Sequence, residues 1–250
     1  MVKKLLSVAA ASLALFAGAA QADLVIDSFT VGQSAAVDFG GGAVWSASTS
    51  GNASILGGQR DIYAKKISGP GIVSALVDTS LNTFNFSQDT NTAGTGLLRY
   101  DGANTAAAID TAGLGAQDFT QFGTGVTFTF KSDSLYVDPM TTPLVVPFVI
   151  SIEVWGTGGS AYTSISQIAY ATYGNYVSDT ILFSELGWSN TGFDWTSVSA
   201  MQIGFNTGSP VAIDVDVSIT APTAIPEPGS IALAGLALLG LGAARRRKAS

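Results

Sequence analysis

The residues best suited to chemistry are Glu153 and Glu185, the only glutamates between residues 23 and 225. Two carboxyl groups about 5–9 Å apart hydrolyse a glycoside, one as acid and the other as base or nucleophile. Glu153 lies in the apolar run from Leu144 to Trp155, where burial would raise its pKa, as a general acid requires. The alternative is that each carboxylate is solvated or paired with an arginine. Because strand glutamates usually have that structural role, we expect the protein not to be an enzyme.

The chain contains no cysteine and no histidine. A cysteine nucleophile, a Ser-His-Asp triad and a histidine-based zinc or non-haem iron site are therefore excluded. Proton transfer by imidazole at neutral pH is excluded as well. Without disulfides, the folded part must be stabilised by its core alone.

A second candidate site is the pair Arg60 and Asp61, which follows Gly57 and Gly58. The pair would contact a sugar or an ion where the glycines let the backbone approach a ligand. The alternative is a structural arginine–carboxylate bridge at a sheet edge, with the glycines marking a β-bulge. Bidentate arginine pairs are common within folds, which favours the structural alternative.

Aromatic residues could stack on sugar rings, and Tyr173 begins a Tyr-Gly-Asn-Tyr turn that would form an exposed platform with Trp188 nearby in the sequence. Aromatic side chains more often fill the core of a β-sandwich, so we expect most of them to be structural. The full set of candidates is Trp45, Trp155, Trp188, Trp195, Tyr162, Tyr170, Tyr173 and Tyr176.

A calcium site is the one metal site that the composition leaves open. The segment that starts at Asp89 begins like an EF-hand loop, but Ala93 cannot ligate and Tyr100 stands where the bidentate glutamate belongs. A structural calcium ion held by scattered aspartates and carbonyl groups remains an alternative to plain solvation. The candidate ligands are Asp27, Asp38, Asp214 and Asp216. We expect no other cofactor.

The elements that would position these residues are strands, because apolar and polar residues alternate along most of the chain. The clearest segments are 211–219, 126–131 and 199–205, and 144–155 is apolar on both faces like a central strand. Shorter candidates are 25–30, 55–66, 72–77, 81–87, 96–100, 165–171 and 180–183. Many short strands between glycine-rich turns predict an all-β, jelly-roll-like β-sandwich over residues 23–220. Asp194 would cap a single turn before the strand at 199, and residues 221–228 read as a linker.

Acidic residues outnumber basic ones in the part that would fold. Residues 23–224 hold seventeen acidic and five basic side chains, a formal charge of −12. Such a surface repels nucleic acid and anionic lipid, so neither is an expected partner of this part of the chain.

The N-terminal 22 residues have the pattern of a secretory signal peptide. Lys3 and Lys4 precede an apolar stretch that ends in Ala20-Gln21-Ala22. Signal peptidase would cut between Ala22 and Asp23, which makes a permanent N-terminal membrane helix the weaker alternative.

The C-terminus, residues 229–250, combines an apolar stretch with four cations. Gly229 to Ala244 is 16 residues long. As a helix it would span about 24 Å of a hydrocarbon layer about 30 Å thick, and snorkelling arginines could cover the difference. Arg245, Arg246, Arg247 and Lys248 would stay in the cytoplasm, which leaves residues 23–225 outside. A buried core helix is the alternative, but such a helix rarely ends in consecutive cations.

The tripeptide Pro226-Glu227-Pro228, the apolar stretch and the basic cluster together resemble the PEP-CTERM sorting signal of exported bacterial proteins. The resemblance covers about the last tenth of the chain. It implies recognition of that tripeptide by an exosortase-type membrane transpeptidase, docking at the inner membrane and cleavage near the tripeptide. It also implies release to the cell surface or to an extracellular polysaccharide matrix.

Two further segments resemble jelly-roll domains found in front of this sorting signal. Residues 55–61 are similar to an I-L-G-G-E-R-D pattern, except that Gln59 replaces the acid. Residues 193–198 precede a strand and an acidic final strand. The expected function is therefore a non-enzymatic structural or adhesive surface protein. The alternatives are a carbohydrate-binding module and a hydrolase that uses Glu153 and Glu185.

Overall fold

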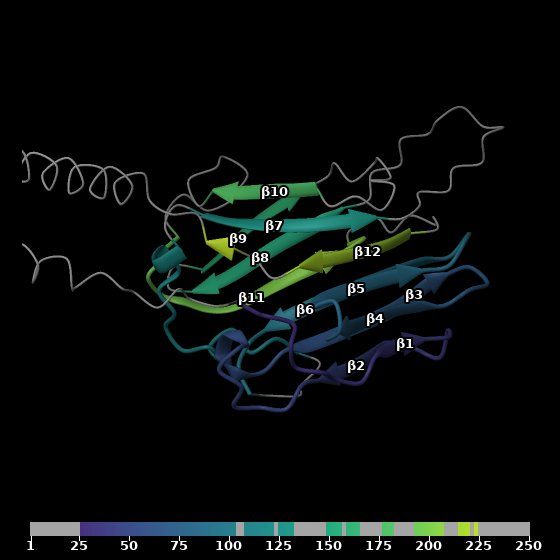
Figure 1. The fold of residues 1–250 in the computed structure, drawn as a ribbon, viewed down its shortest axis with the longest axis horizontal. Coiled ribbons are helices and arrows are strands. Elements are labelled where there is room, and N and C mark those ends of the chain that lie inside the picture. The colour runs from purple at the N-terminus through teal and green to yellow at the C-terminus, as the bar shows by residue number, and fades with distance from the viewer. Residues whose placement is uncertain are drawn as a thin grey trace, which may run out of the picture.

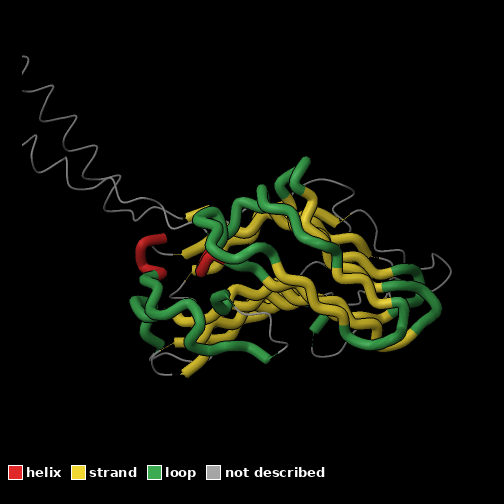
Figure 2. Tube along the Cα trace, turned by 90° about the horizontal axis from the view of Figure 1, so that it is seen from below, coloured by secondary structure: helices red, strands yellow, loops and turns green. Residues whose placement is uncertain are grey.

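The protein is a two-layer sandwich of antiparallel β-sheets in a computed structural model (Figures 1 and 2). The structure describes residues 26–103, 108–122, 125–132, 149–156, 159–165, 177–182, 193–207, 215–220 and 223–224. Within these ranges the only helical elements are two 3₁₀ turns, at Leu56–Gly58 and Phe119–Phe122. The prediction of an all-β sandwich is confirmed.

The first sheet has seven strands. Its order is β1 (Ala36–Asp38), β4 (Val73–Asp78), β5 (Thr83–Gln88), β12 (Val215–Thr220), β7 (Gly125–Ser132) and β10 (Val177–Leu182), and β13 (Thr223–Ala224) also pairs with β7. β12, which comes late in the chain, thus lies between β5 and β7.

The second sheet has six strands. Its order is β2 (Val44–Ala47), β3 (Asp61–Ser68), β6 (Ala93–Tyr100), β11 (Val198–Phe205), β8 (Ile150–Gly156) and β9 (Gly159–Ile165). The apolar run that ends at Trp155 contributes β8, which lies inside this sheet, as expected for a strand that is apolar on both faces.

The core lies between the sheets, where alternate residues of each strand point inward. Phe84 and Phe86 of β5 meet Phe205 of β11, with ring centroids 5.1 and 5.7 Å apart. Opposite them, Gly96 of β6 has no room for a side chain, because a Cβ atom there would overlap the Phe86 ring. This glycine therefore fixes how closely the two sheets approach each other.

Most predicted strands are present, and several start or end elsewhere than predicted. The segments 72–77, 81–87, 126–131 and 199–205 correspond to β4, β5, β7 and β11. β6 starts three residues before the predicted segment 96–100. The predicted segment 165–171 overlaps β9 only at Ile165, and its other residues lie outside the described residues. The short edge strands β1 and β2 were not predicted from the sequence.

Near the N-terminus one predicted strand is wrong, and another begins later than predicted. Segment 25–30 contributes only an isolated bridge between Asp27 and Ile55. Segment 55–66 becomes a strand only at Asp61, because Gly57 and Gly58 adopt φ angles of 69° and 81° in a 3₁₀ turn. Gly57 and Gly58 therefore lie in a turn between the bridge and β3, outside any strand, instead of marking a bulge within one.

The local turn before β11 is as predicted. The Asp194 carboxylate accepts a hydrogen bond from the Thr196 backbone N–H at 3.0 Å, and the Ser197 N–H donates to the Asp194 carbonyl at 3.1 Å.

In the segment predicted as a linker, Thr223 and Ala224 pair with β7. The predicted signal peptide and C-terminal helix lie outside the described residues, and none of the described elements is a helix of membrane-spanning length and hydropathy.

Candidate binding face

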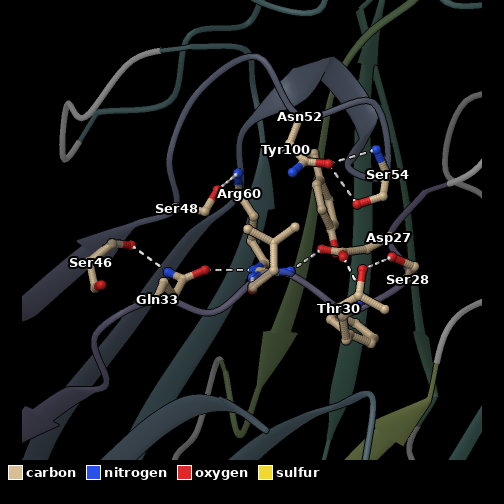
Figure 3. Close-up of polar contacts among 12 residues, drawn as sticks. Asp27, Ser28, Thr30, Gln33, Ser46, Ser48, Asn52, Ser54, Arg60 and Tyr100 are labelled. Carbon is tan, nitrogen blue, oxygen red and sulfur yellow. Dashed lines mark hydrogen bonds and ion pairs between the residues drawn. The ribbon is translucent and has the colours of Figure 1, made fainter. Parts of the chain in front are cut away.

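The Arg60 side chain lies inside the protein at the centre of a buried polar cluster (Figure 3). Its Nη1 donates to Asp27 Oδ2 at 2.6 Å, and neither side chain is exposed. Its Nε donates to Gln33 Oε1 and its Nη2 to the Val31 carbonyl, both at 2.6 Å. The Tyr100 hydroxyl donates to the same Asp27 oxygen at 3.0 Å.

This cluster fastens the N-terminal segment to the six-stranded sheet. Burial raises the pKa of the Asp27 carboxyl, and the neighbouring Arg60 opposes that shift. Burial also raises the pKa of the Tyr100 hydroxyl well above its usual range. All of these groups satisfy one another within the fold, so the geometry favours the structural role for Arg60.

Asp61, the next residue, lies on the opposite side of the sheet. Neighbouring residues of an extended chain point to opposite faces, and Ile62 and Ala64 of β3 are buried in the core. Asp61 and Tyr63 therefore belong to the outer face of the six-stranded sheet. The structure separates the pair that the sequence presented as one site.

Strand register assembles a row of polar residues across this outer face. Asp61 of β3 pairs with Arg99 of β6, Arg99 with Gln202 of β11, and Gln202 with Glu153 of β8. The adjoining row begins with Trp45 of β2 opposite Tyr63. We call Trp45, Tyr63, Asp61, Arg99, Gln202 and Glu153 the outer-face row.

Arg99 holds the aromatic part of the outer-face row in place. Its guanidinium carbon lies 4.5 Å from the centroid of the Trp45 ring, and the Trp45 and Tyr63 centroids are 4.6 Å apart. Arg99 Nε and Nη2 donate to Gln202 Oε1 at 3.0 and 2.9 Å. The planar guanidinium thus fixes an aromatic ring and an amide at once, which a flexible ammonium group could not do.

Asp61 is the most perturbed carboxyl of this face. Its Oδ1 accepts a hydrogen bond from Gln59 Nε2 at 3.3 Å, whereas its buried Oδ2 has no hydrogen-bond partner. Burial raises the pKa of Asp61 to about 6; the negative charge of Asp101 adds to the rise, and Arg99 opposes it. Asp61 therefore takes up a proton in mildly acidic solution.

Glu153 lies on the outer face, half-buried, and burial raises its pKa as the sequence predicted. Asp61 and Glu153 are three strand spacings apart in register, which amounts to about 14 Å. Both glycosidase geometries need carboxyl groups closer than about 10 Å. A backbone separation of this size does not favour the two residues as a catalytic pair.

The other predicted site residues fall into two groups. Tyr173, Glu185 and Trp188 lie outside the described residues. Asp38 is described, and its carboxylate accepts hydrogen bonds from the backbone N–H groups of Gly40 at 2.6 Å and Lys66 at 2.8 Å.

The aspartates predicted as calcium ligands are likewise placed only in part. Asp27 belongs to the buried cluster around Arg60, Asp214 lies outside the described residues, and Asp216 is described only by its backbone pairing with β5. In the part of the chain that the structure describes, no three acidic side chains gather as a metal site would require.

Sequence reasoning missed Arg99, Gln202 and the role of Trp45. The alternation along β6 indicates that Thr95, Leu97 and Arg99 share one face of the sheet. It does not indicate which residues of the neighbouring strands lie beside them. The partner strands come from residues 44–47 and 198–205, so only the fold brings Trp45 and Gln202 to Arg99.

Comparison with known proteins identifies the C-terminal segment. Residues 224–248 match the family model described as the PEP-CTERM protein-sorting motif. The chain carries a PEP-CTERM motif. No curated protein matches the chain as a whole. The PEP-CTERM motif includes Pro226 to Pro228 and the basic cluster at Arg245, as the resemblance stated from the sequence implied.

Solved structures similar to the sandwich include two modules from Clostridium thermocellum. One is the family 30 carbohydrate-binding module of a cellulosomal cellulase, with 20% identity, coverage of 57% of this chain and 74% of that one, and a TM-score of 0.34. The other is a family 11 carbohydrate-binding module in complex with a β-1,3-1,4-mixed-linked tetrasaccharide, with 13% identity, coverage of 79% and 98%, and a TM-score of 0.33. Likeness at this level carries no inference about ligand.

Proposed function

We propose that this protein is an exported, non-enzymatic surface or matrix protein whose sandwich binds a neutral polysaccharide through the outer-face row. The observation that carries the proposal is the arrangement of Trp45, Tyr63, Arg99 and Gln202. Aromatic rings stack on sugar rings, and amide and carboxyl groups form hydrogen bonds with sugar hydroxyls. Holding these groups in place before binding lowers the entropic cost of association.

The charge around the outer-face row argues for a neutral ligand. Asp61, Asp101 and Glu153 lie on or beside the row, and Arg99 is the cation within it. The guanidinium of Arg99 donates to Gln202 and lies over Trp45, so its charge supports the site internally. An anionic polysaccharide would meet more negative than positive charge here and would be repelled.

The PEP-CTERM motif supports the route by which the protein reaches its ligand. Signal peptidase would release the chain at Ala22, and the apolar segment 229–244 would hold it in the inner membrane. An exosortase-type transpeptidase would then act near Pro226 to Pro228, and the sandwich would reach the cell surface or the polysaccharide matrix. Deletion of residues 226–250 followed by cell fractionation tests this route, because an unchanged surface-associated amount would contradict it.

Affinity gel electrophoresis tests the binding proposal. The purified full chain is run through gels that contain a neutral β-glucan, a uronic-acid polymer or no polysaccharide. We expect retardation by the neutral polymer alone, and Trp45→Ala should abolish it. Phe39→Ala is the matched control, because Phe39 is an aromatic residue that is 73% exposed, follows β1 and is not part of the outer-face row.

Two other results would contradict the binding proposal. Equal retardation of the wild-type chain and the Trp45→Ala variant would remove the outer-face row as the binding site. Absence of retardation by all neutral polymers in a glycan panel would leave the purely structural or adhesive role as the function. Hydrolysis of any of these polymers would contradict the non-enzymatic part of the proposal.

A further inference from the structure

The last two strands of the chain form one interrupted ladder against β7 (Figure 1). β12 pairs with β7 as far as Ile219 opposite Phe130, and β13 pairs with it again at Thr223 opposite Thr127. Between these two pairs the chain advances four residues while β7 advances three, so the register shifts by one residue. β13 therefore continues β12 along the edge of β7.

The end of this ladder overlaps the start of the PEP-CTERM motif. Ala224 pairs with Val126 of β7, and the matched motif begins at the same residue. Only Ile225 separates Ala224 from Pro226. With two peptide units between them, the Cα atom of Pro226 can lie no more than about 7 Å from that of Ala224. While β13 is paired, the tripeptide is thus tied to the sandwich.

β13 is also the shortest strand of the described sheets. It has two residues, and its pairing is with β7 alone. β5, which covers the other edge of β12, pairs with it only as far as Thr220 opposite Thr83, where β5 begins. Detaching β13 would free the chain back to Thr220 and allow Pro226 to reach about 20 Å from that residue.

We propose that β13 is a latch that must leave β7 before the membrane transpeptidase can take the Pro226–Pro228 tripeptide. An enzyme embedded in the bilayer receives its substrate at membrane depth, and a folded sandwich cannot follow the tripeptide there. The partner therefore recognises a detached, extended segment and not the edge of the folded sheet. This inference rests on the sorting route proposed above and is independent of polysaccharide binding.

Engineered disulfides test the latch cleanly, because the chain has no cysteine of its own. Thr127→Cys with Thr223→Cys joins β13 to β7 at a registered pair. Val126→Cys with Ala224→Cys is the neighbouring pair. Adjacent antiparallel pairs alternate between close and wide spacing, so at least one of the two variants has suitable geometry for a disulfide. Intact-mass measurement of the full chain identifies the oxidised variant.

The matched control is Lys131→Cys with Ser218→Cys, which joins β12 to β7 in the same ladder but leaves β13 free. Pulse-chase labelling of the full chain, in cells that contain the transpeptidase, follows loss of the C-terminal segment. We expect processing of the locked variant to be at least tenfold slower than that of the wild type. Dithiothreitol should restore it, and the control should match the wild type.

A second variant distinguishes a tripeptide that cannot reach the enzyme from a fold that the disulfide has disturbed. Insertion of six glycine and serine residues between Ala224 and Ile225 of the locked chain gives the tripeptide the missing reach while β13 stays paired. We expect this insertion to restore processing with the disulfide intact. Wild-type processing of an oxidised, uninserted locked chain would overturn the latch. Failure of the wild-type chain itself to be processed would overturn the sorting route and the latch together.

Discussion

Arg60 and Arg99 are both almost fully buried, yet they serve opposite sides of the same sheet. Arg60 has no exposed surface and is paired with Asp27 among groups that satisfy one another. Arg99 is 6% exposed and is fixed between Trp45 and Gln202 beside an incompletely satisfied Asp61. The two arginines therefore differ in their neighbours: the groups around Arg60 satisfy one another, whereas Asp61 beside Arg99 keeps one carboxylate oxygen without a hydrogen-bond partner.

The largest expected effect concerns Arg60, on the core side of the sheet. Arg60→Met should lower the free energy of unfolding by about 3–5 kcal/mol, because it leaves the Asp27 carboxylate buried without its cation. Urea unfolding of the purified chain measures the loss. The double variant Asp27→Asn with Arg60→Met should lose less than Arg60→Met alone. Equal losses would show that the ion pair is not the source of the effect.

The pH dependence of stability tests the burial of Asp61 on the outer face of the sheet. The folded-state pKa of Asp61 is raised from 3.8 to about 6, so its contribution to stability is fully present below pH 4 and is lost as the pH rises through 6. The loss is at most about 3 kcal/mol. In Asp61→Asn this component is absent, so the variant should gain on the wild type as the pH rises from 4 to 7.

Comparing the two proteins at each pH isolates Asp61, because the raised pKa values of Asp27 and Glu153 are common to both. Urea unfolding between pH 4 and pH 7 supplies the two curves. Parallel curves over that range would mean that the Asp61 carboxyl titrates as it does in the unfolded chain.

Arg99→Lys keeps the positive charge at residue 99 but removes the planar guanidinium group with its paired donors. We expect affinity for the neutral polysaccharide to fall about tenfold, because an ammonium group cannot stack flat on Trp45 while donating twice to Gln202. Isothermal titration calorimetry measures this change. The control is Lys65→Arg, an exposed position on β3, and it should bind like the wild type.

The smallest effect concerns Gln59, where related patterns have an acid. Its amide donates to Asp61 Oδ1 at 3.3 Å, and an ionised glutamate could not donate. Gln59→Glu should therefore lower the free energy of unfolding by about 1 kcal/mol at pH 7. The difference should shrink as the pH falls below about 4, where a glutamate becomes protonated and can donate to Asp61. A variant as stable as the wild type at pH 7 would show that the Gln59 hydrogen bond adds nothing to stability.

The sequence predicted the class of fold because alternation is a local property, as the strands at 72–77 and 126–131 demonstrate. It predicted strand ends less well where backbone conformation overrides side-chain pattern, as at Gly57 and Gly58. It could not predict the outer-face row, because Trp45, Arg99 and Gln202 are distant in the chain and meet only through strand order. The sequence analysis grouped Arg60 with Asp61 because the two residues are adjacent. In an extended chain, however, adjacent side chains point to opposite faces of the sheet.

The contact between Gly96 and the Phe86 ring has a consequence for how such proteins diverge. Any side chain at residue 96 would push the two sheets apart, so descendants of this chain must keep a glycine there or rebuild the core opposite it. On the outer face, Trp45 and Gln202 are held by contacts between side chains, with Arg99 and Tyr63, and not by the spacing of the two sheets. Exchanges on the outer face therefore leave the distance between the sheets unchanged, so a lineage that duplicates this gene can alter that face while it keeps the framework.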